Sequence, residues 1–421
     1  MHDAVDASAV LDRATIDAPH PFYRALRERG PIHRVGATGV HLVVRWDAIE
    51  EALGREADFS ANLTGVLIRA PGGEPAVFEL PSTGATDVIA TADEPAHGVH
   101  RGLLQPHLRD ALVAALEPRL RTWARDAIDA FVARGGGDFA ADVAELVPAR
   151  TVVALLDLAE SDVANVRRWA MMGGDMLAGD VDAARMATLG AETAKMAAFL
   201  GERLERARAE LERAERERGD ARAPASLAHV LARGARDGTV DATHAVGIAL
   251  VLFGAAGEST ASLVGNAARL LAEQPALAAR LRAEPALVPR FVEEVVRLEP
   301  PFKGHYRAVR RACTLAGAAL APGDRLFLAW ASANRDAAVV EAPDELRLDR
   351  RFPKRHMGFG RGSHFCIGAH LARLEGRVVV EELLARTSDV ALDPARPPAY
   401  THSMFVRRHD RLPLVVRAAA D

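Results

Sequence analysis

In the first ninety residues, the pattern of apolar and polar positions predicts a short helix, then a strand that leads into a second helix, and then a long loop. Residues 17–33 predict a short helix that ends before a Gly-Pro break. Residues 40–47 alternate like a strand and lead into a helix that starts near Asp47. Residues 60–92 are rich in Gly, Pro and Thr and are expected to form a long ordered loop, which in a compact enzyme usually has a function.

The pattern becomes helical from about residue 95 to residue 300. Apolar residues recur at helical spacing through residues 143–158, whereas residues 201–220 alternate acid and base, as on an exposed helix. After Pro300, strand-like runs are broken by an Ala-Pro-Gly-Asp turn, and a helix returns from Gly368 to about Thr387. We therefore expect a mainly α fold with small β-sheets (α+β), formed by residues 1–421 as a single domain.

Composition narrows the class of protein. The 421 residues are 49% hydrophobic, enough for a large core, and 57 acidic against 53 basic residues leave a net charge of −4, which does not suggest nucleic acid. The acidic N-terminus does not resemble a signal peptide, and the longest apolar run, from Ala245 to Gly257, is too short to span a bilayer. Two cysteines exclude a disulfide framework and are consistent with a reducing cytoplasm.

The strongest chemical signal is the stretch 356–373, in which Gly360, Gly362 and Gly368 flank Cys366. Glycine lets the backbone approach a ligand closely, and the N-terminus of the following helix stabilises a thiolate. Such a thiolate is a ligand for haem iron. Two other interpretations stay open: an inert buried cysteine, and a zinc site, since three histidines lie nearby in the sequence (His356, His364 and His370).

The stretch from Phe359 to Gly368 reads Phe-x-x-Gly-x-His-x-Cys-x-Gly and resembles the cysteine loop of the cytochrome P450 superfamily. This resemblance implies a helical body with haem b buried between a long central helix and the cysteine loop. It also implies that Cys366 is the axial iron ligand, that His364 binds a haem propionate, and that Phe359 packs beside the sulfur.

A second motif lies in the long apolar helix, where two glycines that disfavour helix precede Glu258, Ser259 and Thr260. It resembles the acid–hydroxyl pair of the family, which implies that these residues relay protons to dioxygen. In the direct alignment Ser259 takes the place of the usual threonine. A shift of one residue would make Thr260 the relay, and backbone hydrogen bonding by these hydroxyls is a further alternative.

Two more motifs extend the resemblance over nearly the whole chain. Glu294 and Arg297, three apart on one helix face, resemble the structural Glu-x-x-Arg pair of the family. Its third partner would be Arg350 or Arg351. A basic group follows the pattern of family residues that bind haem propionates; its members are His97, Arg101 and Arg307.

Together the motifs predict a bacterial-type haem monooxygenase in the cytoplasm. The expected partners are dioxygen, a hydrophobic small-molecule substrate and a separate ferredoxin- or flavodoxin-type electron donor, with no nucleic acid and no membrane. The donor is expected to dock near the cysteine loop through basic residues such as Arg361, Arg373 and Arg377. A peroxygenase that uses hydrogen peroxide and a non-catalytic haem-binding protein are the alternative functions.

The wall of the substrate pocket is expected to be mostly apolar. It would include residues 60–92, residues near Ala255, residues 302–305, and the neighbourhood of Met404 and Phe405. Lys303 and His305 are the polar exceptions, and they could meet a polar or acidic group of the substrate.

Overall fold

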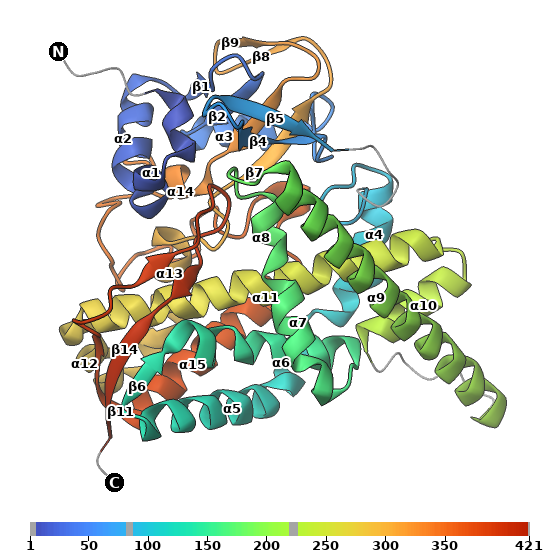
Figure 1. The fold of residues 1–421 in the computed structure, drawn as a ribbon, viewed down its shortest axis with the longest axis vertical. Helices are drawn as coiled ribbons and strands as arrows, with labels where there is room; N and C mark the ends of the chain where they lie inside the picture. The colour runs from blue at the N-terminus through green and yellow to red at the C-terminus, as the bar shows by residue number, and fades with distance from the viewer. Residues whose placement is uncertain (1–5, 81–86, 219–225, 420–421) are drawn as a thin grey trace.

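A long helix, α11 (Ala242–Glu273), runs through the middle of the molecule, and the other large helices pack around it (Figure 1). The structure is a computed structural model, and it describes residues 6–80, 87–218 and 226–419. The side chain of Asp241 caps the start of α11 by accepting a hydrogen bond from the backbone N–H of His244, at 2.7 Å. The helix packs against α6, α7, α9, α10 and α15.

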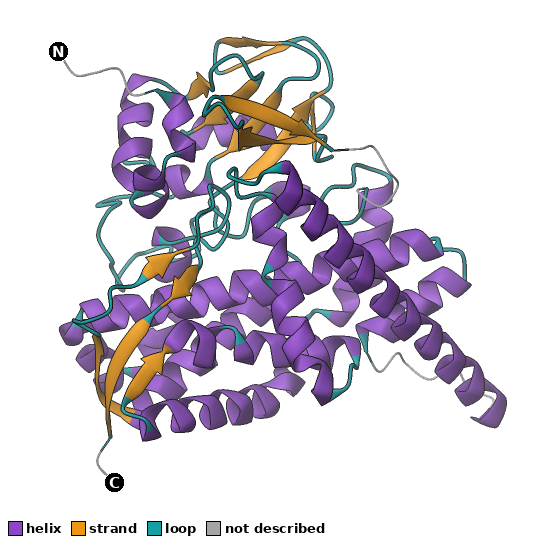
Figure 2. Ribbon diagram, in the orientation of Figure 1, coloured by secondary structure: helices purple, strands orange, loops and turns teal. Residues whose placement is uncertain are grey.

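Helices make up most of the described chain (Figure 2). The other helices are α1 (Arg13–Asp17), α2 (Pro19–Arg29), α3 (Trp46–Leu53), α4 (Ala96–Leu104), α5 (Asp110–Ala133), α6 (Leu146–Leu156), α7 (Val163–Ala170), α8 (Met172–Met176), α9 (Ala183–Arg218), α10 (Leu227–Arg236), α12 (Pro275–Ala283), α13 (Val288–Leu298), α14 (Trp330–Ala333) and α15 (Ala369–Arg386).

The strands form small sheets at two ends of the molecule (Figures 1 and 2). One sheet has the order β1-β2-β10-β7-β3, in which only β2 and β10 are parallel, and another has the antiparallel order β11-β14-β6. The strands are β1 (Ile32–Arg34), β2 (Val40–Val43), β3 (Phe59–Ser60), β4 (Gly65–Arg69), β5 (Pro75–Glu79), β6 (Gly136–Asp138), β7 (His305–Val309), β8 (Cys313–Leu315), β9 (Ala318–Leu320), β10 (Arg325–Leu328), β11 (Thr387–Leu392), β12 (Ala399–Tyr400), β13 (His409–Arg411) and β14 (Pro413–Ala418). The prediction of a mainly α fold with small sheets is confirmed.

One prediction for the N-terminal part was wrong. Residues 60–92 do not form a loop throughout, because β4 and β5 pair as an antiparallel hairpin, with Val66 opposite Phe78. The hairpin buries Val66 and Leu67 against a second apolar cluster that contains Tyr306 and Met404. These partners lie more than 200 residues away in the sequence, so local composition alone could not reveal them. Residues 81–86 of the predicted loop lie outside the described residues.

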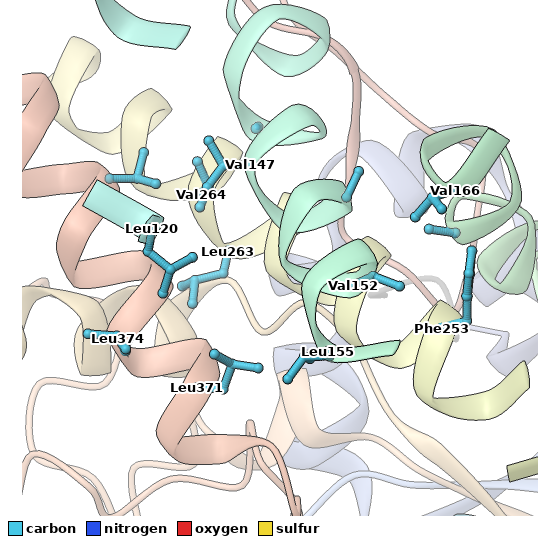
Figure 3. Packing of buried hydrophobic residues seen from close by; sticks show 14 of the residues in the cluster. Leu120, Val147, Val152, Leu155, Val166, Phe253, Leu263, Val264, Leu371 and Leu374 are labelled. Atoms are coloured by element: carbon cyan, nitrogen blue, oxygen red, sulfur yellow. The ribbon is translucent and has the colours of Figure 1, made fainter. Parts of the chain in front are cut away.

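The main apolar core lies between α11 and the helices that flank it. Figure 3 shows side chains from α5, α6, α11 and α15 meeting there, among them Leu120, Val152, Leu263 and Leu371. Of the described helices, α11 alone is long and apolar enough to cross a membrane, and it extends well beyond the apolar run noted in the sequence. Its packing against five other helices is that of a core helix. This core places α11 opposite the loop that carries Cys366.

Candidate active site

The cysteine loop holds the Cys366 thiol in a half-buried turn just before α15. The backbone N–H of Cys366 donates to the carbonyl oxygen of Phe359 at 2.9 Å, which closes the loop. Gly360 and Gly362 have φ values of 68° and 73°, a region that favours glycine. Burial raises the pKa of the Cys366 thiol, while the backbone N–H of Gly368 donates to its sulfur and lowers it. Ligation by a metal would deprotonate the thiol.

A cavity of about 230 Å³ lies between this loop and α11. Cys366 and Phe359 line one side, and α11 contributes Ala255, Ser259 and Thr260 to another. Most of the remaining lining is apolar and comes from several elements; α6, the end of α13 and the segment that follows it contribute Val152, Leu155, Leu156, Val296, Pro301 and Phe302. The thiol thus opens onto an apolar chamber beside the central helix.

The four side chains expected from the sequence to bind the haem propionates all line this same cavity: His97, Arg101, Arg307 and His364. The rings of His97 and His364 lie 4.0 Å apart, and Arg101 donates to the carbonyl oxygen of Phe365 at 2.8 Å. Residues from α4, β7 and the cysteine loop therefore meet at the cavity, although they are far apart in the sequence.

Arg307 is buried, with 8% of its surface exposed. It donates to the carbonyl oxygen of Tyr306, and it forms no ion pair with any residue in the described ranges. Burial lowers the pKa of Arg307 to about 10, so the guanidinium remains charged at neutral pH. A buried cation without a bound anion fits a carboxylate-bearing ligand.

The acid and the hydroxyls of the α11 motif separate in the structure. Ser259 and Thr260 line the cavity, but Glu258 does not. The Glu258 carboxylate accepts the backbone N–H of Gly174 at 2.7 Å and the Nε of Arg408 at 3.2 Å. Burial raises the pKa of Glu258 to about 8, although Arg408 opposes this shift. The carboxylate therefore lies against α8 and Arg408.

The two hydroxyls differ in their partners. The hydroxyl of Ser259 donates to the carbonyl oxygen of Ala255, one turn earlier. The hydroxyl of Thr260 has no hydrogen-bond partner among the described residues, and its side chain reaches the cavity. The backbone hydrogen bond considered in the sequence is therefore present for Ser259.

Glu294 and Arg297 on α13 form an ion pair of 2.7 Å, and both side chains are 1% exposed. Arg350 completes the cluster, since its Nε donates to Glu294 at 2.9 Å. Arg351, the other candidate from the sequence, lies over the ring of Phe352 instead. Arg297 also donates to the carbonyl oxygen of Asn334, so the cluster ties α13 to the segments before the cysteine loop.

Parts of the predicted pocket wall lie elsewhere. Lys303 is buried but absent from the cavity lining, because its Nζ donates to the carbonyl oxygen of Ser403 at 2.6 Å. Burial lowers its pKa well below the usual value. Met404 and Phe405 pack in the second apolar cluster and do not line the cavity, whereas Phe302 and His305 do. Within residues 60–92, the described lining residues are Ile89 and Ala90.

The basic residues considered for docking are paired within the chain. Arg361 lies 3.0 Å from Glu50, Arg373 lies 2.6 Å from Glu293, and Arg377 lies 2.7 Å from Glu117. A partner that docks through them would have to compete with these acids.

The histidines considered for zinc do not gather around Cys366. His356 is bound to Glu293 at 2.8 Å. Among the described residues, the group of side chains close enough to share an ion is Asp157, Glu210 and His229. The guanidinium of Arg203 is already bound to both acids of that group.

Glu375 on α15 was not identified from the sequence, although it is a buried acid that lines the cavity. Its carboxyl group accepts a hydrogen bond from the hydroxyl of Thr151, at 3.0 Å. Burial raises the pKa of Glu375 to about 8. The spacing along α15 could have identified Glu375 from the sequence. It lies four residues after Leu371 and three before Val378, so it shares one helix face with these two buried residues.

The raised pKa of Glu375 predicts a pH-dependent stability. The folded state holds the proton more tightly than the unfolded state, so folding becomes less favourable as pH rises from the usual value of 4.5 to about 8. Glu375→Gln removes this contribution. We expect the variant to gain free energy of unfolding relative to wild type, by at most about 1.4 kcal/mol per pH unit in that window. Urea unfolding at pH 5, 6.5 and 8 measures the difference, and a difference independent of pH would contradict the prediction.

Comparisons with known proteins agree with this geometry. The family model described as Cytochrome P450 matches residues 185–411. Cytochrome P450 144 of Mycobacterium tuberculosis is 37% identical over 99% of this chain and 93% of its own length. Cyclomarin C epoxidase CymV of Salinispora arenicola is 30% identical over 88% of this chain and 89% of its own length.

A solved structure gives the same result for the fold. CYP109E1 from Bacillus megaterium, in complex with testosterone, has a TM-score of 0.80 at 25% identity and covers 96% of this chain and 98% of its own. The similarity extends from end to end and includes both the cysteine loop and the central helix. The chain therefore belongs to the cytochrome P450 family and is a P450 monooxygenase, an oxidoreductase of the haem-thiolate class.

Proposed function

We propose that this enzyme inserts one oxygen atom of dioxygen into a hydrophobic small organic molecule, by hydroxylation or epoxidation. The observation that carries the proposal is the apolar cavity that joins the Cys366 thiol to α11. Two similar proteins support it: one is a cyclomarin C epoxidase, and the structure of the other contains testosterone. Apolar walls with a few polar groups suit such molecules.

The residues of the cavity fit haem b. Cys366 would be the axial ligand to the iron, Phe359 would pack beside the sulfur, and the propionates would be held by the basic group: His97, Arg101, Arg307 and His364. Arg307 supports this fit, because it is a buried cation that lacks an anion among the described residues. When bound, the haem supplies the reductive activation of dioxygen.

The hydroxyl of Thr260 is the better placed of the two proposed proton donors. It has no partner among the described residues, whereas the Ser259 proton is committed to the carbonyl oxygen of Ala255. Glu258 would have to leave Arg408 before it could supply protons from behind these hydroxyls. With a pKa of about 8, it carries an exchangeable proton at neutral pH.

Removal of the relaying hydroxyl should divert electrons from product to hydrogen peroxide. We expect Thr260→Val, which keeps the shape, to lower product per dioxygen consumed by about 100-fold, the lower end of the usual contribution of a positioned proton donor. Ser259→Ala should have a smaller effect. Oxygen uptake, peroxide and product are measured together. The reverse order of effects would assign the relay to Ser259, and unchanged coupling in both variants would exclude both hydroxyls.

Electrons would come from a separate ferredoxin- or flavodoxin-type protein in the cytoplasm. The test supplies NADPH, a ferredoxin and its reductase under ¹⁸O₂, together with a panel of hydrophobic compounds. The proposal expects one ¹⁸O atom in the product and the other in water. Product formed only with added hydrogen peroxide would instead indicate a peroxygenase.

A further inference from the structure

His305 brings an imidazole into the cavity between apolar side chains and the polar group formed by Arg307 and His364. The segment between α13 and β7 contributes Pro301 and Phe302 to the lining, β7 begins with His305, and α14 contributes Trp330. The other three side chains offer mainly carbon surface. His305 is thus a polar group placed where a hydrophobic molecule would lie.

The two residues that precede His305 hold its backbone in place. The backbone N–H of Lys303 donates to the carbonyl oxygen of Phe405 at 2.7 Å, and its Nζ donates to Ser403. Next along the chain, a Cβ at Gly304 would lie 2.5 Å from the carbonyl oxygen of Leu328, so glycine lets this segment pass close to β10. The imidazole is therefore presented from a fixed backbone.

Aromatic rings surround the imidazole, but they do not satisfy its nitrogens. The ring centroids of Phe302, Phe405 and Trp330 lie 5.7, 5.3 and 6.1 Å from that of His305. Neither ring nitrogen is hydrogen-bonded to a residue in the described ranges. Burial, reinforced by the charge of Arg307, lowers the pKa of His305 to about 3. A neutral imidazole offers one N–H donor and one acceptor nitrogen.

We propose that His305 recognises a neutral oxygen-bearing group of the substrate, a carbonyl or a hydroxyl. The imidazole would form a hydrogen bond with this group within the cluster of aromatic rings. The inference rests on the proposed function, because it assigns the cavity to a hydrophobic substrate. His305 is half-buried, and a substrate that covered its ring nitrogens without a hydrogen bond would lose free energy; a carbonyl or hydroxyl on the substrate avoids this loss, whereas a pure hydrocarbon does not. His305 thereby orients the substrate.

The test compares two probes that share a skeleton, 4-phenylcyclohexanone and phenylcyclohexane. Their dissociation constants are measured by equilibrium dialysis against the haem-loaded enzyme. We expect wild type to favour the ketone, and we expect His305→Phe, which keeps a ring in the same surround, to lower that preference by roughly tenfold. His305→Gln, which restores a donor and an acceptor, should recover part of it. His33→Gln serves as the matched control, because His33 on β1 is hydrogen-bonded to the backbone carbonyls of Leu26 and Gly30 and is absent from the cavity lining.

Each contrary result has a distinct meaning. If wild type does not favour the ketone, or if His305→Phe keeps the same preference, the proposal is overturned. Loss of bound haem in His305→Phe would assign the imidazole to the cofactor and would also overturn it. Failure of the proposed function is seen separately, since wild type would then show no haem spectrum and no oxygenated product.

Discussion

Cys366→Ala should abolish the red-shifted Soret band that the reduced enzyme gives with carbon monoxide, and with it all oxygenation. If Cys366 ligates the iron as proposed, its thiolate would push electron density toward the iron and favour O–O cleavage, and no other sulfur among the described residues lines the cavity. Optical spectra of the reduced, carbon monoxide-treated protein measure the first effect, and product formation measures the second.

Cys313→Ala is the matched control for this variant. Cys313 is the other cysteine of the chain; it lies on β8 and does not line the cavity. Its removal should leave the band and the turnover unchanged. A Cys366→Ala protein that kept the band would show that another residue ligates the iron, and the site assigned here would be wrong.

Arg297→Met should cost about 3–5 kcal/mol of unfolding free energy, because it leaves the buried carboxylate of Glu294 without its closest cation. The pKa of Glu294 is held below its usual value; burial alone would raise it, but Arg297 and its other partners outweigh burial. Arg350 retains one contact to Glu294, so the charge is not left wholly unpaired. Guanidinium unfolding monitored by circular dichroism measures the loss.

Two further variants make this prediction testable even if Arg297→Met does not fold. Arg297→Lys keeps the charge but loses the two-pronged contact with Glu294, so it should lose less stability. Arg208→Met removes a solvent-exposed pair on α9, which water screens, so it should cost much less stability than Arg297→Met. Equal losses for Arg297→Met and Arg208→Met would contradict the role given to the buried cluster.

Local sequence patterns predicted those parts of the site whose residues lie within a few positions of one another. The turn from Phe359 to Gly368 closes on itself through one backbone hydrogen bond and two glycines with positive φ, so its residues suffice to indicate a ligand loop. Glu294 and Arg297 lie one helical turn apart, which places them on one face wherever α13 packs. The alternation of helical and strand patterns likewise determined the fold class.

Side chains whose partners are distant in the sequence could be placed only from the folded structure. Glu258 lies against Arg408, 150 residues later, so the acid adjacent to the cavity-lining hydroxyls does not itself line the cavity. Lys303 is held by Ser403, whereas His305, two residues on, lines the cavity. Spacing along a helix or strand fixes the direction in which a side chain leaves the backbone, but its partners come from segments that only folding brings near. The family, the fold class and the cysteine loop could therefore be predicted from the sequence. The polar groups that face the substrate cavity could be identified only from the folded structure, because their partners are distant in the sequence.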